Sequence, residues 1–171
     1  MEEISIEHVK RMADERQRQQ LEKLLIRVVE DGASIGFLPP LAPDTANEYW
    51  KSVLQPNVLL FAAKINNQIV GSAQLHLCTK PNGLHRAEIA KLMTHPEHRR
   101  KGIARLLMQA LEGKAREEGR SLLVLDTREG DPSNALYRSL DFIQAGRIPN
   151  FAQSSTGVLE ATILYYKILG E

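Results

Sequence analysis

Cysteine is nearly absent from the sequence, and neither sign of charge is in excess. Cys78 is the only cysteine among the 171 residues, which excludes an intramolecular disulfide and a metal site built from several cysteines. The chain has 22 basic and 21 acidic side chains, a formal net charge of +1. Nucleic-acid-binding proteins normally show a basic excess, so we expect no nucleic-acid partner.

Long apolar runs are also missing. No segment reaches the roughly 20 apolar residues that a membrane-spanning helix needs, and the first residues, MEEI, lack the basic start and apolar stretch of a signal peptide. We therefore expect a cytoplasmic protein without a membrane partner. Its length suits one domain over residues 1–171 with one core. Its apolar and charged fractions, 43% and 25%, are those of an ordinary globular protein.

The spacing of apolar residues predicts a mixed fold. Recurrence at three and four residues predicts helices over 13–31, from Asp44 as N-cap to about 54, over 102–119 and over about 132–140. Apolar runs bounded by turn residues predict strands over 58–65, 68–78, 86–94, 121–127, 142–148 and 159–168, with a further short candidate near Ile4. Together they predict an α/β (α+β) fold, a mixed, mostly antiparallel twisted sheet of about 6–7 strands flanked by about 4 helices.

A basic, glycine-containing turn stands where the strand over 86–94 ends and the next helix begins. The first turn of a helix offers backbone N–H groups without intrahelical partners and a partial positive charge, which together favour an anion such as a pyrophosphate. Gly102 allows close backbone approach because it has no Cβ. The side chains that add positive charge are Arg99, Arg100, Lys101 and Arg105. The alternative is a solvated basic turn that caps an ordinary helix.

This turn resembles the coenzyme-binding signature of the GNAT acetyltransferases. Arg99-x-x-Gly102-x-Ala104 matches the pattern Arg/Gln-x-x-Gly-x-Gly/Ala. A second element, SNALY at 133–137 followed by Leu140-Asp141-Phe142, resembles the family's Ala-x-x-Leu-Tyr-x-x-x-Gly-Phe. The resemblance covers about residues 58–142. It implies a GNAT fold and an N-acetyltransferase, an acyltransferase that uses acetyl-CoA as co-substrate and no metal.

The resemblance also implies where the coenzyme binds. The turn and the helix start would hold the pyrophosphate through their backbone, and the strand end before them would pair with the pantetheine like an added strand. The implied coenzyme-binding residues are Leu92, Met93, Thr94, Arg99, Arg100, Lys101, Gly102, Ile103, Ala104, Arg105 and Ser133. Two residues depart from the pattern. Gly130 stands where the family often has a coenzyme-contacting Asn, and Asp141 replaces a Gly, although Asp tolerates a left-handed backbone.

Tyr137 is the catalytic residue that the resemblance implies, as the general acid. Acetyl transfer expels a thiolate whose conjugate acid has a pKa of about 8.5 by analogy with cysteine, and a phenol titrates near 10. A phenol beside the sulfur can therefore donate a hydrogen bond or a proton as charge develops. The alternative is a core aromatic whose hydroxyl reaches water or a carbonyl.

Two carboxylates are candidates for the base. An alkyl ammonium, with a pKa of about 10.4, must lose a proton before it can attack, and a partly desolvated carboxylate could accept it. Glu88 lies among apolar residues of a strand, and it resembles the basic glutamate of histone-type members in its position before Arg99. Asp126 ends the strand over 121–127, where α/β sheets build sites. The alternatives are an outward-facing strand carboxylate for Glu88 and a loop-capping one for Asp126.

Residues 123–167 resemble a subgroup that contains the tabtoxin-resistance acetyltransferase, on the segments 124–131, 146–152 and 162–167. In that likeness the loop over 32–37 lines the acceptor site. The resemblance implies a small-molecule primary amine as acceptor, in the manner of an amino-acid-like antibiotic or toxin. We expect a monomer or homodimer. The alternatives are an acetyltransferase that acts on a protein or peptide amine, and a non-catalytic sensor of acyl-CoA.

Overall fold

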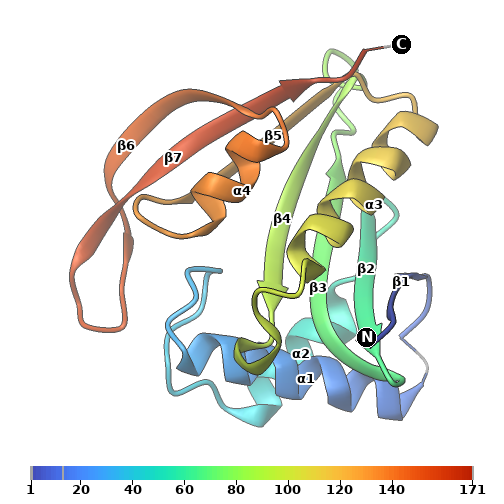
Figure 1. The fold of residues 1–171 in the computed structure, drawn as a ribbon, viewed down its shortest axis with the longest axis vertical. Coiled ribbons are helices and arrows are strands. Elements are labelled where there is room, and N and C mark those ends of the chain that lie inside the picture. The colour runs from blue at the N-terminus through green and yellow to red at the C-terminus, as the bar shows by residue number, and fades with distance from the viewer. Residues whose placement is uncertain (1, 13, 171) are drawn as a thin grey trace.

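A computed structural model describes residues 2–12 and 14–170. They form a seven-stranded sheet in the order β1-β2-β3-β4-β5-β7-β6, with helices against both faces (Figure 1). The strands are β1 (Ile4–Val9), β2 (Val58–Ile65), β3 (Gln68–Leu77), β4 (Arg86–Thr94), β5 (Leu122–Arg128), β6 (Ile143–Gln153) and β7 (Leu159–Ile168). The helices are α1 (Glu15–Glu30), α2 (Pro43–Ser52), α3 (Ile103–Glu117) and α4 (Ser133–Ser139), with a short 3-10 turn, η1 (Pro96–His98).

Neighbouring strands run antiparallel except for β4 and β5, which are parallel and joined through α3. The structure thus confirms the predicted fold class, including the short strand near Ile4. No helix in the described residues is long and apolar enough to cross a membrane.

Each face of the sheet has its own core. On one face α1 and α2 bury Leu25 and Trp50 against strand residues that include Met93. On the other face α3 and α4 cover a second core, to which Ile89 of β4 and Leu123 of β5 contribute. Successive side chains of a strand point to opposite faces, so the strands supply both cores.

The starts of α1 and α2 can be compared with the predicted helix starts. The predicted start of the first helix at residue 13 lies outside the described residues, and α1 is capped by Asp14, whose side chain accepts from the backbone N–H of Arg16 and Gln17. The prediction that Asp44 caps the second helix was wrong. Ala42 is the N-cap and Pro43 the first helical residue, because the fixed φ of proline suits that position.

The strand predicted over 142–148 is longer in the structure, where β6 continues to Gln153. Pro149 interrupts the pattern in the sequence because it has no N–H to donate. It is tolerated because β6 is an edge strand, and its pairing with β7 shifts register between Ile148 and Ala152.

The feature of the sheet that positions the site is the parting of β4 and β5. Their parallel pairing covers three residue pairs within the described structure, from Arg86 with Leu122 to Glu88 with Val124, and Figure 1 shows the two strands diverging beyond it. The pairing of β4 with β3 also shifts register, so that β4 has an extra residue, and Lys91 there has φ +58. This is a β-bulge, which bends a strand.

Candidate active site

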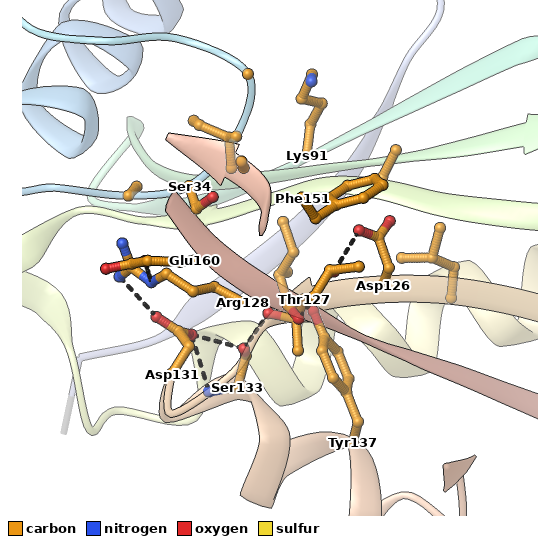
Figure 2. A pocket seen from close by; sticks show the side chains of 18 of the residues that line it. Ser34, Lys91, Asp126, Thr127, Arg128, Asp131, Ser133, Tyr137, Phe151 and Glu160 are labelled. Carbon is orange, nitrogen blue, oxygen red and sulfur yellow. Dashed lines mark hydrogen bonds and ion pairs between the residues drawn. The ribbon is translucent and has the colours of Figure 1, made fainter. Parts of the chain in front are cut away.

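A pocket of about 370 Å³ opens where β4 and β5 part. Its walls are the loop between α1 and α2 (residues 33–36), β4 from Glu88 to Leu92, the end of β5 with the turn that follows, α4, and the β6–β7 hairpin. Figure 2 shows the side chains that these elements bring together. Five of the predicted site residues line the pocket: Leu92, Glu88, Asp126, Ser133 and Tyr137.

Strand alternation explains why the two carboxylates meet. Ala87 and Ile89 point into the core under α3, so Glu88 between them points to the opposite face. Leu125 of β5 packs into that same core, which turns Asp126 to the face of Glu88. The two carboxylates therefore enter one pocket from neighbouring strands.

The pocket changes the acidity of Glu88. Burial raises the pKa of Glu88 above its ordinary value, the negative charge of Asp126 raises it further, and the positive charge of Lys91 opposes both effects. A raised pKa makes Glu88 a stronger base when it is ionised. Asp126 is held by a hydrogen bond from Thr162 Oγ1 at 2.7 Å.

Tyr137 enters the pocket from α4. Its ring is buried and packs against Phe142 and Tyr165, with ring centroids 6.0 and 5.8 Å away. Burial, with smaller effects from the negative charges of Asp131 and Asp126, raises the pKa of Tyr137 well above the ordinary value of a phenol. The hydroxyl therefore stays protonated at neutral pH and remains a hydrogen-bond donor.

Polar contacts fix α4 beside β5. Asn134 Nδ2 donates to the carbonyls of Arg128 and Asp131 at 2.9 and 2.8 Å, and Asn134 Oδ1 accepts from the Tyr165 hydroxyl at 2.7 Å. Ser133 Oγ donates to Asp131 Oδ2 at 2.6 Å and lies 2.7 Å from Thr127 Oγ1. The predicted coenzyme contact at Ser133 thus involves a hydroxyl that the protein already holds.

Asp141 and Gly130, the two departures from the family pattern, have left-handed backbones. Asp141 has φ +68, so the Asp at this position adopts the left-handed backbone that it was expected to tolerate. Gly130 has φ +85, and an added Cβ there would meet no heavy atom within 4 Å.

Arg128 organises the outer wall of the pocket. Its guanidinium lies 3.4 Å from Asp131 Oδ1 and 3.4 Å from Glu160 Oε2, and it donates to the carbonyl of Gly32 at 3.0 Å. It thereby ties the loop between α1 and α2 to β5. Sequence reasoning missed this role because Gly32 and Glu160 are far from Arg128 in the chain and share no pattern with it.

The turn before α3 has the backbone geometry of an anion site. Arg100 and Gly102 have φ +62 and +80, and alternating left-handed residues of this kind can form a concavity of N–H groups. α3 begins without a side-chain cap among the described residues, so its first N–H groups are free. A Cβ on Gly102 would meet no heavy atom within 4 Å, so the space above the turn is open to a ligand.

The cationic side chains of this turn are less available to an anionic ligand than the sequence suggests, because most of them already have partners in the protein. Arg99 pairs with Asp31 at the end of α1, Lys101 pairs with Glu2 at 2.8 Å, and Arg105 Nη2 donates to Ser139 Oγ at 2.8 Å. None of the three lines the pocket in the described structure. The backbone of the turn therefore fits an anion better than most of its side chains do.

The remaining predicted coenzyme-binding residues also lie outside the pocket. The side chains of Met93 and Ile103 are buried in the two cores, which leaves only their backbone for a ligand. Thr94 ends β4, and Ala104 lies in the first turn of α3. Conversely, the pocket contains Lys91, Phe151 and Glu160, which the sequence analysis did not single out as site residues. Phe151 lies in the segment 146–152 that resembles the subgroup, whereas Lys91 and Glu160 belong to no motif.

Comparison with known proteins agrees with this architecture. Residues 25–142 match the sequence profile of the Acetyltransferase (GNAT) family. The chain is 36% identical over 104 residues to an uncharacterized N-acetyltransferase in the hisH-hisA intergenic region of Azospirillum brasilense, a match that spans 59% of this chain and 62% of that relative. The match thus covers less than two thirds of the relative's length.

Solved structures share the fold over nearly the whole chain. An N-acetyltransferase from Staphylococcus aureus Mu50 superposes with a TM-score of 0.83 at 18% identity, over 98% of this chain and 99% of that one. A ribosomal-protein-alanine N-acetyltransferase from Brucella melitensis gives 0.80 at 23%, over 96% and 99%. The protein yncA from Salmonella typhimurium, solved with its cofactor acetyl-CoA, gives 0.79 at 19%, over 98% and 95%. By its sequence profile, the chain belongs to the acetyltransferase (GNAT) family.

Proposed function

We propose that the protein transfers the acetyl group of acetyl-CoA to a primary amine of a small molecule, by direct attack of the amine. The observation that carries this proposal is that Glu88, Asp126 and Tyr137 line one pocket. A carboxylate base and a neutral phenol are the groups that the reaction needs, because protons must leave the nitrogen of the acceptor and one proton must reach the sulfur.

Acetyl-CoA supplies the acetyl group as a thioester. The part of β4 beyond Glu88 has no β5 partner in the described structure, so backbone groups of Leu92 and Thr94 are available to the pantetheine. The open turn at Gly102 and the free N–H groups at the start of α3 suit the pyrophosphate. The residues present therefore fit the coenzyme mainly through their backbone.

Glu88 serves as the base in this proposal. It accepts a proton from the ammonium of the acceptor, directly or through a water molecule, and the neutral amine then forms the new C–N bond. The raised pKa of Glu88 brings it closer to the amine in basicity, which favours this transfer. Asp126 adds negative charge that attracts the ammonium.

Tyr137 serves as the acid. As the C–S bond breaks, its hydroxyl donates to the departing sulfur and stabilises the negative charge that develops there. The raised pKa of Tyr137 means that this proton is present throughout the ordinary pH range. The nitrogen loses two protons in all: one passes to Glu88 before the attack, and the second leaves as the amide forms and, through water, replaces the proton that Tyr137 gives to the sulfur. Glu88 then releases its proton to water, so the protein is unchanged at the end of the cycle.

The dimensions of the pocket favour a small acceptor over a peptide. A volume of about 370 Å³ is near the lower end of the range for small-molecule sites, and the loop over 33–36 and the β6–β7 hairpin both contribute walls. An amino-acid-like antibiotic or toxin, as in the tabtoxin-resistance subgroup, is the acceptor class that we propose.

The experiment is a coenzyme A release assay with amino acids, amino-acid antibiotics, polyamines and short peptides as acceptors. We expect release with a small amine, and loss of release in Glu88→Gln and Tyr137→Phe. Release with peptides alone would favour the peptide acetyltransferase instead. A folded protein that binds acetyl-CoA and transfers to none of the amines would favour the sensor.

A further inference from the structure

Lys91 lies in the pocket although strand alternation alone would not put it there. Ala87 and Ile89 of β4 face the core under α3, so strict alternation would send Lys91 into the same core. The bulge interrupts this pattern, and Met93 packs in the opposite core, under α1 and α2. The bulge therefore turns Lys91 to the face that carries Glu88.

The backbone of Lys91 is in a conformation that residues with a Cβ avoid. Its φ is +58, in the left-handed region that Gly, Asn and Asp populate more readily. Disfavoured backbone of this kind clusters at functional sites, and bulges often re-aim a side chain next to an active site. This arrangement is the first observation that points to a role for the lysine.

The charges around the pocket give the second observation. Six charged side chains line it, and three of them are ion-paired, because Arg128 pairs with both Asp131 and Glu160. The other three form no ion pair within the described part of the chain. They are Glu88, Asp126 and Lys91.

The ammonium of Lys91 points to the loop between α1 and α2. A Cβ on Gly36 would come within 3.1 Å of Lys91 Nζ, so the absence of a side chain at Gly36 leaves room for the ammonium. Figure 2 shows Lys91 at one end of the group of side chains and Tyr137 at the other. Lys91 is half-buried, and in Figure 2 its ammonium points away from Tyr137.

We propose that Lys91 binds an anionic group, a carboxylate or a similar oxyanion, that the acceptor carries besides its amine. This inference rests on the proposed function and specifies its substrate class. The amine of the acceptor then faces Glu88 and Asp126 while its anion faces Lys91, so zwitterionic amines are preferred over simple amines. A hydrogen bond between two charged groups in a partly desolvated site is stronger than a neutral one.

A matched pair of acceptors tests this proposal: an amino acid that the wild-type enzyme acetylates, and its primary carboxamide. The two share the amine and the side chain and differ in the negative charge. Because the amide also lowers the pKa of the amine, each compound is compared between enzymes rather than with the other compound. The variants are Lys91→Met and, as a control on an exposed lysine of α2 outside the pocket, Lys51→Met.

We expect Lys91→Met to raise the KM for the acid by about 10- to 100-fold, the usual effect of one charged hydrogen bond. At a pH above the acid limb of the rate profile, where Glu88 is ionised in both enzymes, the KM for the amide and both kcat values should stay within about threefold of wild type, because uniform binding rather than chemistry is lost. Lys91→Arg, which keeps the positive charge, should retain most of the affinity for the acid. Lys51→Met should change neither compound. Lys91→Gln replaces the methionine variant if that variant does not fold.

Equal changes in KM for acid and amide, or unchanged kinetics, would overturn the anion site and leave the acetyltransferase proposal intact. Lys91 would then serve only to offset the negative charge of Glu88 and Asp126. A folded wild-type protein that acetylates no amino acid, amide or polyamine would instead overturn the proposed function, and the anion site with it.

Discussion

At the scale of single residues, Tyr137 and Tyr165 offer a natural comparison. Their rings lie 5.8 Å apart, but the hydroxyl of Tyr165 donates to Asn134 Oδ1, while that of Tyr137 forms no hydrogen bond with the described residues and borders the pocket. The hydroxyl of Tyr165 is therefore structural, and that of Tyr137 is free to act on a substrate.

We predict that Tyr137→Phe lowers single-turnover acetyl transfer by roughly 10²–10⁴-fold, equivalent to about 2.7–5.4 kcal/mol of barrier. Folding and acetyl-CoA affinity should be nearly unchanged, because the ring is kept. Since the pKa of Tyr137 is raised, the wild-type rate should not fall through phenol ionisation up to about pH 10. Tyr165→Phe is the control. It should lower the melting temperature and leave the rate of acetyl transfer nearly unchanged. A Tyr137→Phe rate within about threefold of wild type, under 1 kcal/mol, would remove this hydroxyl from the mechanism.

The pH dependence of Glu88 is the second prediction. A raised pKa means that Glu88 gains its proton, and the rate falls, at a higher pH than for an ordinary carboxyl. In Glu88→Gln this acid limb should disappear, and the rate should be lowest relative to wild type at neutral pH and recover as the pH nears the amine's own pKa.

Asp126→Asn separates the two carboxylates in the same assay. Because the charge of Asp126 raises the pKa of Glu88, its removal should shift the acid limb to lower pH and keep most of the high-pH rate. If Asp126→Asn abolishes the limb and Glu88→Gln does not, their roles are exchanged. A loss that is equal at all pH values in both variants would indicate positioning of the acceptor rather than proton transfer.

At the scale of elements, the turn before α3 carries the third prediction. Acetyl-CoA should raise the melting temperature in a saturable way, and Gly102→Glu should abolish this shift, because it places a side chain and a negative charge over the free N–H groups. Gly113→Glu is the matched control, since Gly113 lies exposed on the same helix with open space around it. A shift that survives in Gly102→Glu, or that is lost equally in Gly113→Glu, would place the pyrophosphate elsewhere.

The elements themselves were largely predictable from the sequence, because alternation and three-four spacing report which face is buried. The bounds of β2 and β4 agree with the expected ranges, and motif residues such as Gly102 and Tyr137 could be located by resemblance. The bulge at Lys91 could not be predicted, because an extra residue in one strand is defined only by its partner. The ion-paired network of Arg128 was equally hidden, since it joins the end of β5 to two distant segments, at Gly32 and Glu160.

At the scale of the whole molecule, the sheet consists of two blocks. β1 to β4 form one antiparallel block and β5 to β7 the other, and the pairing between them is limited to the start of β4 (Figure 1). Glu88 and Lys91 belong to the first block, whereas Asp126 and Tyr137 belong to the second. The distance between the proposed base and the proposed acid therefore depends on how the two blocks are held together.

The short pairing of β4 with β5 has a consequence for backbone amides in solution. Within residues 2–12 and 14–170, amides of β4 that face the diverging β5 have no strand partner, and unpaired amides exchange their hydrogens with solvent much faster than those of a complete ladder. We predict by hydrogen–deuterium exchange that peptides over 89–94 become protected when acetyl-CoA is added, while peptides over β2, which pairs on both sides, do not change. Unaltered exchange over 89–94 at saturating acetyl-CoA would mean that the coenzyme does not lie along β4. If protection appears, the exchange rate of β4 reports how much of the space between β4 and β5 is occupied by coenzyme. It then also reports the fraction of molecules in which bound ligand joins the two blocks.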